Sequence, residues 1–193
     1  MQLTCKELPN GIRIVHQEIP HTRLVHCGFI LNIGSRDEDQ EQEGLAHFWE
    51  HMAFKGTQKR KTFHILNRLE SLGGELNAYT TKEKVCFYAS VLKDHYDKAA
   101  ELLYDITFHS TFPDKQIERE RQVILEEMAM YRDSPDDAIQ DELDALVFEH
   151  HALGRNILGT EETVSNFHHQ DFIEFISSRL DTSQLVFSVV GNI

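Results

Sequence analysis

EGLAHFWEHMAF, residues 43–54, is the stretch that decides how the rest of this chain is interpreted. Within it, residues 47–51 have the form His-x-x-Glu-His. At 3.6 residues per helical turn, His47 and His51 lie about 40° apart around the axis, and Glu50 falls on nearly the same face. The segment therefore predicts a helix that offers two imidazoles to one metal ion, beside a carboxylate able to polarise a metal-bound water. This is the inverse of the zinc-protease order His-Glu-x-x-His.

The histidine pair alone does not establish a metal site. The chain has 12 histidines, so some pairs at this spacing arise by chance. An intervening Glu on an otherwise apolar helix is rarer, because a carboxylate on a buried face is costly unless it is paired or acts on a metal. The decision between a structural pair and a metal site therefore depends on a third ligand elsewhere in the chain.

Composition predicts an ordinary globular domain with an acidic surface. The chain has 193 residues, a hydrophobic fraction of 40% and a formal net charge of -13, and this length suits a single domain with a substantial core. The negative charge argues against nucleic acid or an anionic membrane as a partner, because both require clustered Lys and Arg. It is compatible with neutral or cationic peptides.

The three cysteines, Cys5, Cys27 and Cys86, form neither a disulfide framework nor a cysteine-type zinc motif, and we expect them to be reduced. Residues 1–7 lack an apolar core, so no signal peptide is predicted. No apolar run approaches the roughly 20 residues of a membrane span. A cytoplasmic location is therefore expected.

Local patterns predict an α+β fold. Leu3–Leu8 and Ile12–Gln17 flank an Asn-Gly turn and form a hairpin. The other predicted strands are a buried strand at Leu24–Ile33, two antiparallel strands at Glu75–Thr80 and Val85–Leu92, and a last strand at Gln184–Val190. Helices are predicted around the motif and at about 62–72, 94–109, 114–132, 136–149 and 167–179. We expect a mostly antiparallel sheet with helices on one face.

The helix at about 114–132 supplies candidates for the third ligand. Its apolar face is marked by Ile117, Ile124, Met128 and Tyr131. At 100° per residue, Glu120 and Glu127 fall within about 60° of the centre of that face, whereas Glu126 falls on the opposite side. One inward carboxylate can complete a metal shell, and the other can hold a ligand imidazole through its second N–H. The neighbouring acidic segment Asp133–Glu142 is typical of a solvated helix start.

Several stretches together resemble the M16 family of zinc peptidases, which includes pitrilysin, insulin-degrading enzyme and the mitochondrial processing peptidase. The resemblance spans essentially the whole chain and is strongest to bacterial, processing-peptidase-like members. It is carried by residues 44–57 (GLAHFWEHMAFKGT), 73–80 (GGELNAYT), 118–128 (ERERQVILEEM), 158–162 (LGTEE) and 189–192 (VVGN).

The resemblance implies a catalytic zinc site. By this likeness, His47, His51 and Glu127 bind one Zn²⁺ per chain, Glu50 is the general base, and Glu120 supports a ligand from behind. The implied activity is zinc-dependent endopeptidase action on peptides or small unfolded proteins. A metal-activated water would attack the scissile carbonyl while Glu50 takes up its proton.

The resemblance also implies partners. The strand containing Asn77, Ala78, Tyr79 and Thr80 looks like the family's substrate-binding edge strand. Family enzymes are longer and use two homologous halves that close over the peptide. We therefore expect residues 1–193 to be a single N-terminal M16 peptidase domain that is truncated at its C-terminal end. Such a chain would carry the metal site but be weakly active or inactive without its second half or a partner subunit.

Three other functions compete with this hypothesis. A non-catalytic M16-type subunit shares the fold, but such subunits usually lose part of the set His47, Glu50, His51 and Glu127. A peptide-binding module remains open, because an edge strand can bind without cleavage. A lyase of the S-ribosylhomocysteine type shares both fold class and motif, but it takes a Cys as third ligand and no Cys follows Cys86.

Overall fold

One six-stranded sheet organises the chain. The structure is a computed structural model that describes residues 3–193. The strand order is β1-β2-β6-β3-β5-β4. Among residues 3–193, the β2–β6 pair is the one parallel pair, and the other neighbouring strands are antiparallel, so the sheet is mostly antiparallel as predicted. The bounds are β1 (Leu3–Glu7), β2 (Arg13–Glu18), β3 (Leu24–Leu31), β4 (Glu75–Thr80), β5 (Val85–Leu92) and β6 (Leu185–Gly191).

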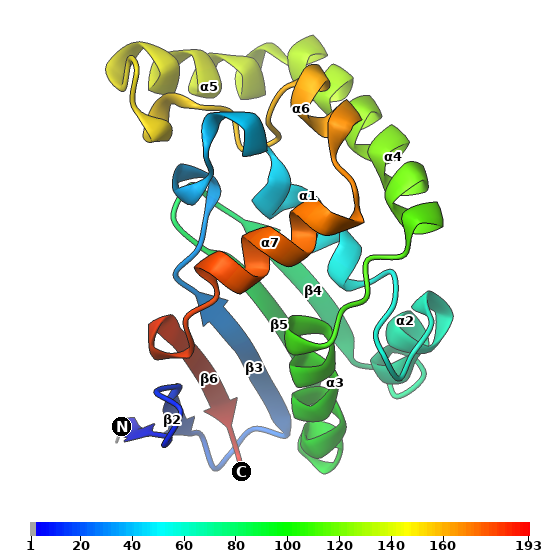
Figure 1. Cartoon of the computed structure of the whole chain (residues 1–193). Helices are drawn as coiled ribbons and strands as arrows, with labels where there is room; N and C mark the ends of the chain where they lie inside the picture. Colours follow the sequence, from blue (N-terminus) through cyan, green and yellow to red (C-terminus); the bar gives the residue numbers. More distant parts are fainter. Residues whose placement is uncertain (1–2) are drawn as a thin grey trace.

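Helices cover one face of this sheet, which confirms the α+β sandwich (Figure 1). In β3, Val25, Cys27 and Phe29 alternate into the core, as expected for a sheet with one covered face. Helices α1, α2 and α3 contact the sheet, and α4 and α7 contact α1. The bounds are α1 (Leu45–Ala53), α2 (Thr62–Glu70), α3 (Tyr96–Phe108), α4 (Asp114–Asp133), α5 (Pro135–Val147), α6 (Glu161–Asn166) and α7 (His169–Arg179).

The structure differs from the predictions in three places. Strand β3 ends at Leu31, two residues early, and its outward residues Leu24 and His26 are exposed, so this strand is buried on one face only. Helix α6 was not predicted, because its single short segment carries too few apolar positions to show a helical period. The last strand is displaced by one residue, since a short 3-10 turn at Thr182–Gln184 precedes it.

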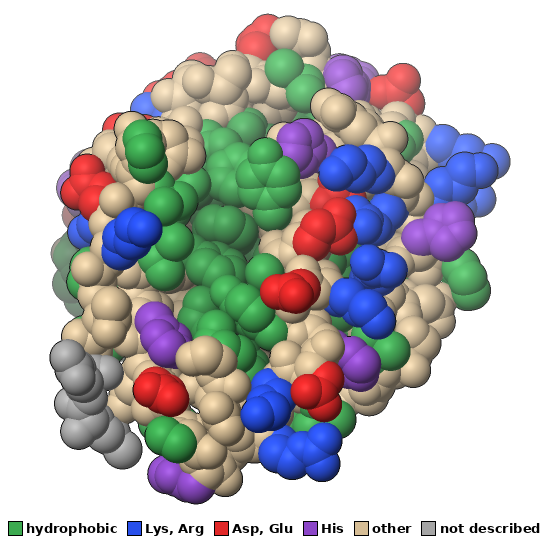
Figure 2. Space-filling view, turned by 90° about the horizontal axis from the view of Figure 1, so that it is seen from below, with side chains coloured by type: hydrophobic (Ala, Val, Ile, Leu, Met, Phe, Trp, Pro, Cys, Tyr) green, Lys and Arg blue, Asp and Glu red, His purple; other side chains and the backbone are tan. Residues whose placement is uncertain are grey.

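One face of the molecule combines an apolar hollow with a basic border (Figure 2). Figure 2 shows one face on which hydrophobic side chains gather in a hollow, with Lys and Arg grouped along one border. Within residues 3–193, none of the helices combines the length and the apolar character that spanning a membrane would require.

Candidate metal centre

Helix α1 holds both motif histidines in a fixed position. Its apolar side chains Phe48, Trp49 and Met52 are fully buried, so the helix cannot shift without opening the core. The helix begins after Gly44, whose φ of 94° lies in the left-handed region. A Cβ at this position would lie 2.4 Å from the carbonyl oxygen of Leu158. Glycine is therefore required for the helix to start here.

The structure brings together the two histidines and one carboxylate of α4. One donor atom each from His47, His51 and Glu127 lie within 4.8 Å of one another. Glu127 Oε2 is 3.9 Å from His47 Nε2 and 3.6 Å from His51 Nε2. Glu126 points to solvent, as the helical phase predicted.

These separations suit a bound ion better than direct contact. Hydrogen bonds between N and O need about 2.7–3.2 Å, so neither imidazole is bonded to Glu127. A tetrahedral zinc with bonds of about 2.0–2.2 Å holds its donor atoms about 3.3–3.6 Å apart. The donor set of two imidazoles and a carboxylate therefore suits zinc, and the separations of 3.6 and 3.9 Å lie at or slightly above this range.

His47 is kept in the neutral form that metal binding needs. Its side chain is buried, and burial together with the neighbouring His51 lowers the pKa of His47 from 6.5 to about 3. A charged imidazole would have to shed its hydration in this position. Its Nδ1 is buried and forms no hydrogen bond with the described residues. The nitrogen Nε2 is directed at the cluster.

Glu120 lies behind His51 rather than among the three donor atoms. Its Oε2 is 3.4 Å from His51 Nδ1, and its Oε1 is 2.8 Å from Lys55 Nζ. Burial alone would raise the pKa of Glu120, but the interactions with His51 and Lys55 outweigh it, so the pKa lies below its ordinary value. A carboxylate on Nδ1 favours the tautomer that leaves Nε2 free to bind a metal.

Glu50 faces the same cleft and is held by strand β4. The hydroxyl of Thr80 donates to Glu50 Oε2 at 2.6 Å. Burial raises the pKa of Glu50 above 4.5, and Glu127 adds to this, whereas Thr80 and His51 oppose it. A carboxylate with a raised pKa is a stronger base, which is the property that proton uptake from water demands.

Next to these residues lies a cleft of about 260 Å³. Strand β4, which contributes part of its lining, is the last strand of the sheet on this side, so one edge carries no strand from the described residues. Asn77 is outside the lining, and its carboxamide oxygen accepts from the backbone N–H of Ala78. The lining comprises His47, Glu50, Ala78, Tyr79, Thr80, Glu127, Tyr131, Asp141, Asn156, Ile157 and Leu158.

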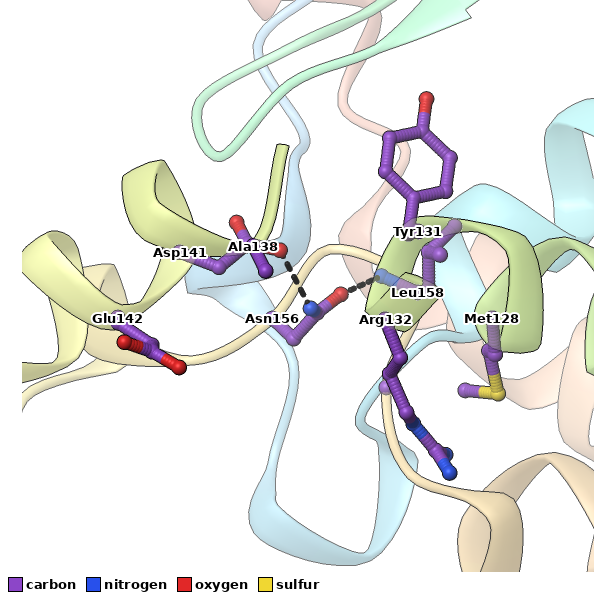
Figure 3. Close-up of a pocket in the computed structure, with 9 residues that line it drawn as sticks. Met128, Tyr131, Arg132, Ala138, Asp141, Glu142, Asn156 and Leu158 are labelled. Atoms are coloured by element: carbon purple, nitrogen blue, oxygen red, sulfur yellow. Dashed lines mark hydrogen bonds between the residues drawn. The ribbon is translucent and has the colours of Figure 1, made fainter. Parts of the chain in front are cut away.

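Part of this lining was missed by the sequence analysis. Asp141, assigned to a solvated helix start, lines the cleft and accepts a hydrogen bond of 2.7 Å from Asn156 (Figure 3). Figure 3 shows the adjoining pocket, in which Asp141 on α5 bonds Asn156 while the ring of Tyr131 on α4 points away from this pair. No local period marks Asp141 or Asn156 as cleft residues, because they meet only through the tertiary fold.

Comparisons with known proteins show the family and the fold of the chain. Residues 13–161 match the family Insulinase (Peptidase family M16). The zinc protease YmxG of Bacillus subtilis is 40% identical over 190 residues, which cover 98% of this chain and 46% of that protein. A protease from Helicobacter pylori has the same fold, with a TM-score of 0.93 and 23% identity over the whole chain and 46% of its own length. An M16 inactive domain from Pseudomonas fluorescens matches at a TM-score of 0.91 and 17% identity, over 100% of this chain and 47% of that one.

The fold and the site define a metallopeptidase-type domain, and the chain belongs to the M16 peptidase family. It spans about half the length of the curated relatives it matches.

Proposed function

We propose that the chain carries the catalytic centre of a zinc-dependent endopeptidase. The observation that supports this most directly is the convergence of His47, His51 and Glu127 within 4.8 Å, beside the buried carboxylate of Glu50. Three protein ligands with an open position are typical of catalytic rather than structural zinc. We propose one Zn²⁺ per chain.

Each ligand has a support that fits this role. His47 would bind through Nε2 from a buried, neutral ring, and His51 through Nε2 while Glu120 holds its Nδ1. Glu127 would supply the negative ligand. When bound, zinc supplies Lewis-acid activation of a water molecule and of the scissile carbonyl.

Glu50 is proposed as the general base. Thr80 occupies its Oε2, which leaves Oε1 to take a proton from the attacking water. The same carboxyl group would then deliver this proton to the leaving amine. Its raised pKa serves both steps, because the carboxylate is basic enough to accept a proton and the acid is still able to release it.

The peptide substrate is proposed to bind along β4. The free edge of this strand offers backbone N–H and C=O groups to an extended peptide, which would add to the sheet as a further strand. Thr80 ends the strand beside Glu50, so a peptide in this position would pass the metal centre. Ala78 and Tyr79 would contact its side chains from the cleft.

We propose that full activity needs a second half, because the chain spans only about half of its relatives. The alternative is a non-catalytic subunit, and the Pseudomonas fluorescens structure shows that this fold also occurs as an M16 inactive domain. The presence of His47, Glu50, His51 and Glu127 together favours the catalytic role.

The test is a peptide-cleavage assay on the chain with and without the remaining half of the full-length protein. We expect chelator-sensitive cleavage that returns when zinc is added back. Cleavage that resists chelators would exclude the zinc mechanism. Zinc binding without cleavage in the full-length protein would support the non-catalytic alternative.

A further inference from the structure

A buried carboxylate outside the motif reaches the start of helix α1. Glu38 lies in the loop between β3 and α1 and is 4% exposed. Its Oε2 accepts from the backbone N–H of Gly44 at 2.9 Å, and its Oε1 accepts from that of Ala46 at 2.7 Å. Both oxygens are thus used on the turn that immediately precedes His47.

This contact replaces a cap that the helix itself lacks. The first N–H groups of an α-helix have no partner within the helix, and a side chain at the N-cap usually accepts from them. The N-cap of α1 is Gly44, which has no side chain to do so. Glu38 supplies the acceptors from six residues upstream, and its carboxyl oxygens meet backbone N–H groups at the positive end of the helix dipole.

The same loop connects α1 to the wall of the cleft. Arg155 Nη1 donates to the backbone carbonyl of Glu38 at 2.8 Å, and Arg155 Nε lies 3.3 Å from Glu43 Oε1. Arg155 directly precedes Asn156, Ile157 and Leu158, which line the cleft. Glu38 therefore lies at the junction of the helix that carries the histidines and the loop that faces the substrate.

We infer that Glu38 is a positioning residue for the proposed metal centre: it fixes the first turn of α1 and thereby the position of His47. The inference rests on the proposed function, because it concerns the affinity of that site for zinc. Burying a carboxylate is costly, and burial raises the pKa of Glu38 to about 8 although Ala46 and Gly44 donate to it. In this structure the cost is offset by two backbone donors that both belong to the start of α1, which supports a geometric role.

The test compares Glu38→Gln with Asp171→Asn. The first change keeps the shape of the side chain but sets an NH₂ group against one of two backbone donors. Asp171 Oδ2 accepts from the backbone N–H of His168 at 2.7 Å at the start of α7, so the second change replaces a similar carboxylate acceptor by a weaker, neutral amide oxygen at another helix. Zinc affinity is measured by competition with a chelator, thermal stability by circular dichroism, and coordination by the absorption spectrum of the Co²⁺-loaded chain.

We expect Glu38→Gln to weaken zinc binding about tenfold and to alter the Co²⁺ spectrum, as when a group that orients a ligand is lost. Asp171→Asn should lower stability without either change. Unaltered zinc affinity and Co²⁺ spectrum in Glu38→Gln would overturn the inference. If the wild-type chain binds no zinc, the proposed function itself fails.

Hydrogen exchange on the wild-type chain tests the cap without a variant. The Gly44 and Ala46 amides should be strongly protected in the metal-free chain. Exchange at the rate of exposed amides would contradict the cap.

Discussion

Two regions meet at the cleft and are held in different ways. The proposed metal cluster comprises His47, His51 and Glu127, with Glu120 behind His51, all on helices α1 and α4. These helices are anchored in the core by side chains such as Trp49 and Ile124, which are fully buried. The opposite side is the cleft wall, which we define as helix α5 with residues 152–158.

The cleft wall has no comparable core. Helix α5 contains no buried residue, and its apolar side chains Ile139, Leu143 and Leu146 are 65%, 52% and 79% exposed. Polar contacts hold it: Lys82 Nζ bonds Asp144 at 2.7 Å and the carbonyl of Leu153 at 2.6 Å.

Because the cluster is held by buried packing and the cleft wall by polar contacts, we expect changes in the two regions to have different effects on metal binding and on substrate binding. Packing fixes the cluster before any ligand arrives, so changes there should act on zinc affinity and on kcat. The wall depends on a few polar contacts of modest free energy, so changes there should act mainly on KM. The predictions below, made for the chain assembled with its second half, test this division.

The largest effect is expected at Glu50. Glu50→Gln keeps the size of the side chain but removes the base, so kcat should fall by about 10²–10⁴-fold while zinc content stays at the wild-type level. Single-turnover kinetics and metal analysis provide the measurements. A variant that cleaved at the wild-type rate would exclude Glu50 as the base.

Glu120 should show a smaller effect, expressed in metal binding. In Glu120→Gln the charge that faces His51 and Lys55 is lost, and zinc affinity should fall about tenfold. Glu126→Gln is the matched control on the same helix, because Glu126 is exposed, and it should bind zinc like the wild type. Equal affinity in both variants would rule out support of His51 by Glu120.

Thr80 tests the link between the edge strand and the base. Thr80→Val keeps the shape of the side chain and removes the hydroxyl that donates to Glu50. A hydrogen bond to a charged group contributes about 1.5 kcal/mol, so kcat should fall about tenfold. Thr80→Ser restores the hydroxyl and should recover most of the rate. If serine fails to restore it, the methyl group rather than the hydroxyl matters.

The smallest effect is expected in the cleft wall. Lys82→Met removes both contacts that tie α5 and Leu153 to the β4–β5 turn. KM should rise about two- to fivefold, as expected for a contact worth under about 1 kcal/mol, with zinc affinity unchanged. A loss of zinc affinity in this variant would show that the wall and the cluster are not separate.

The same division explains which features the sequence revealed. Residues 45–53 and 114–133 carry clear helical periods, so the inward phase of Glu120 and Glu127 and the outward phase of Glu126 followed from spacing alone. The first hairpin followed from the Asn-Gly turn, and the helices on one face of the sheet followed from the order of strands and helices. These features depend on residues close together in the chain.

Features that depend on distant residues were not predictable in this way. The parallel pairing of β2 with β6 joins strands about 170 residues apart. Asp141 has no period that marks it as a cleft residue, and Glu38 caps a helix from outside that helix. Lys55 lies in the turn after α1 and Glu120 lies on α4, so their contact forms only when α1 and α4 pack together.

The most direct test of the central claim is the zinc stoichiometry and affinity of the wild-type chain and of Glu127→Gln, measured by calorimetric titration. The proposed centre predicts one zinc per wild-type chain and an affinity at least about a hundredfold lower in the variant, because a ligand is lost rather than a supporting group. A wild-type chain that binds no zinc, or a variant that binds it equally well, would contradict the assignment of His47, His51 and Glu127 as the metal site.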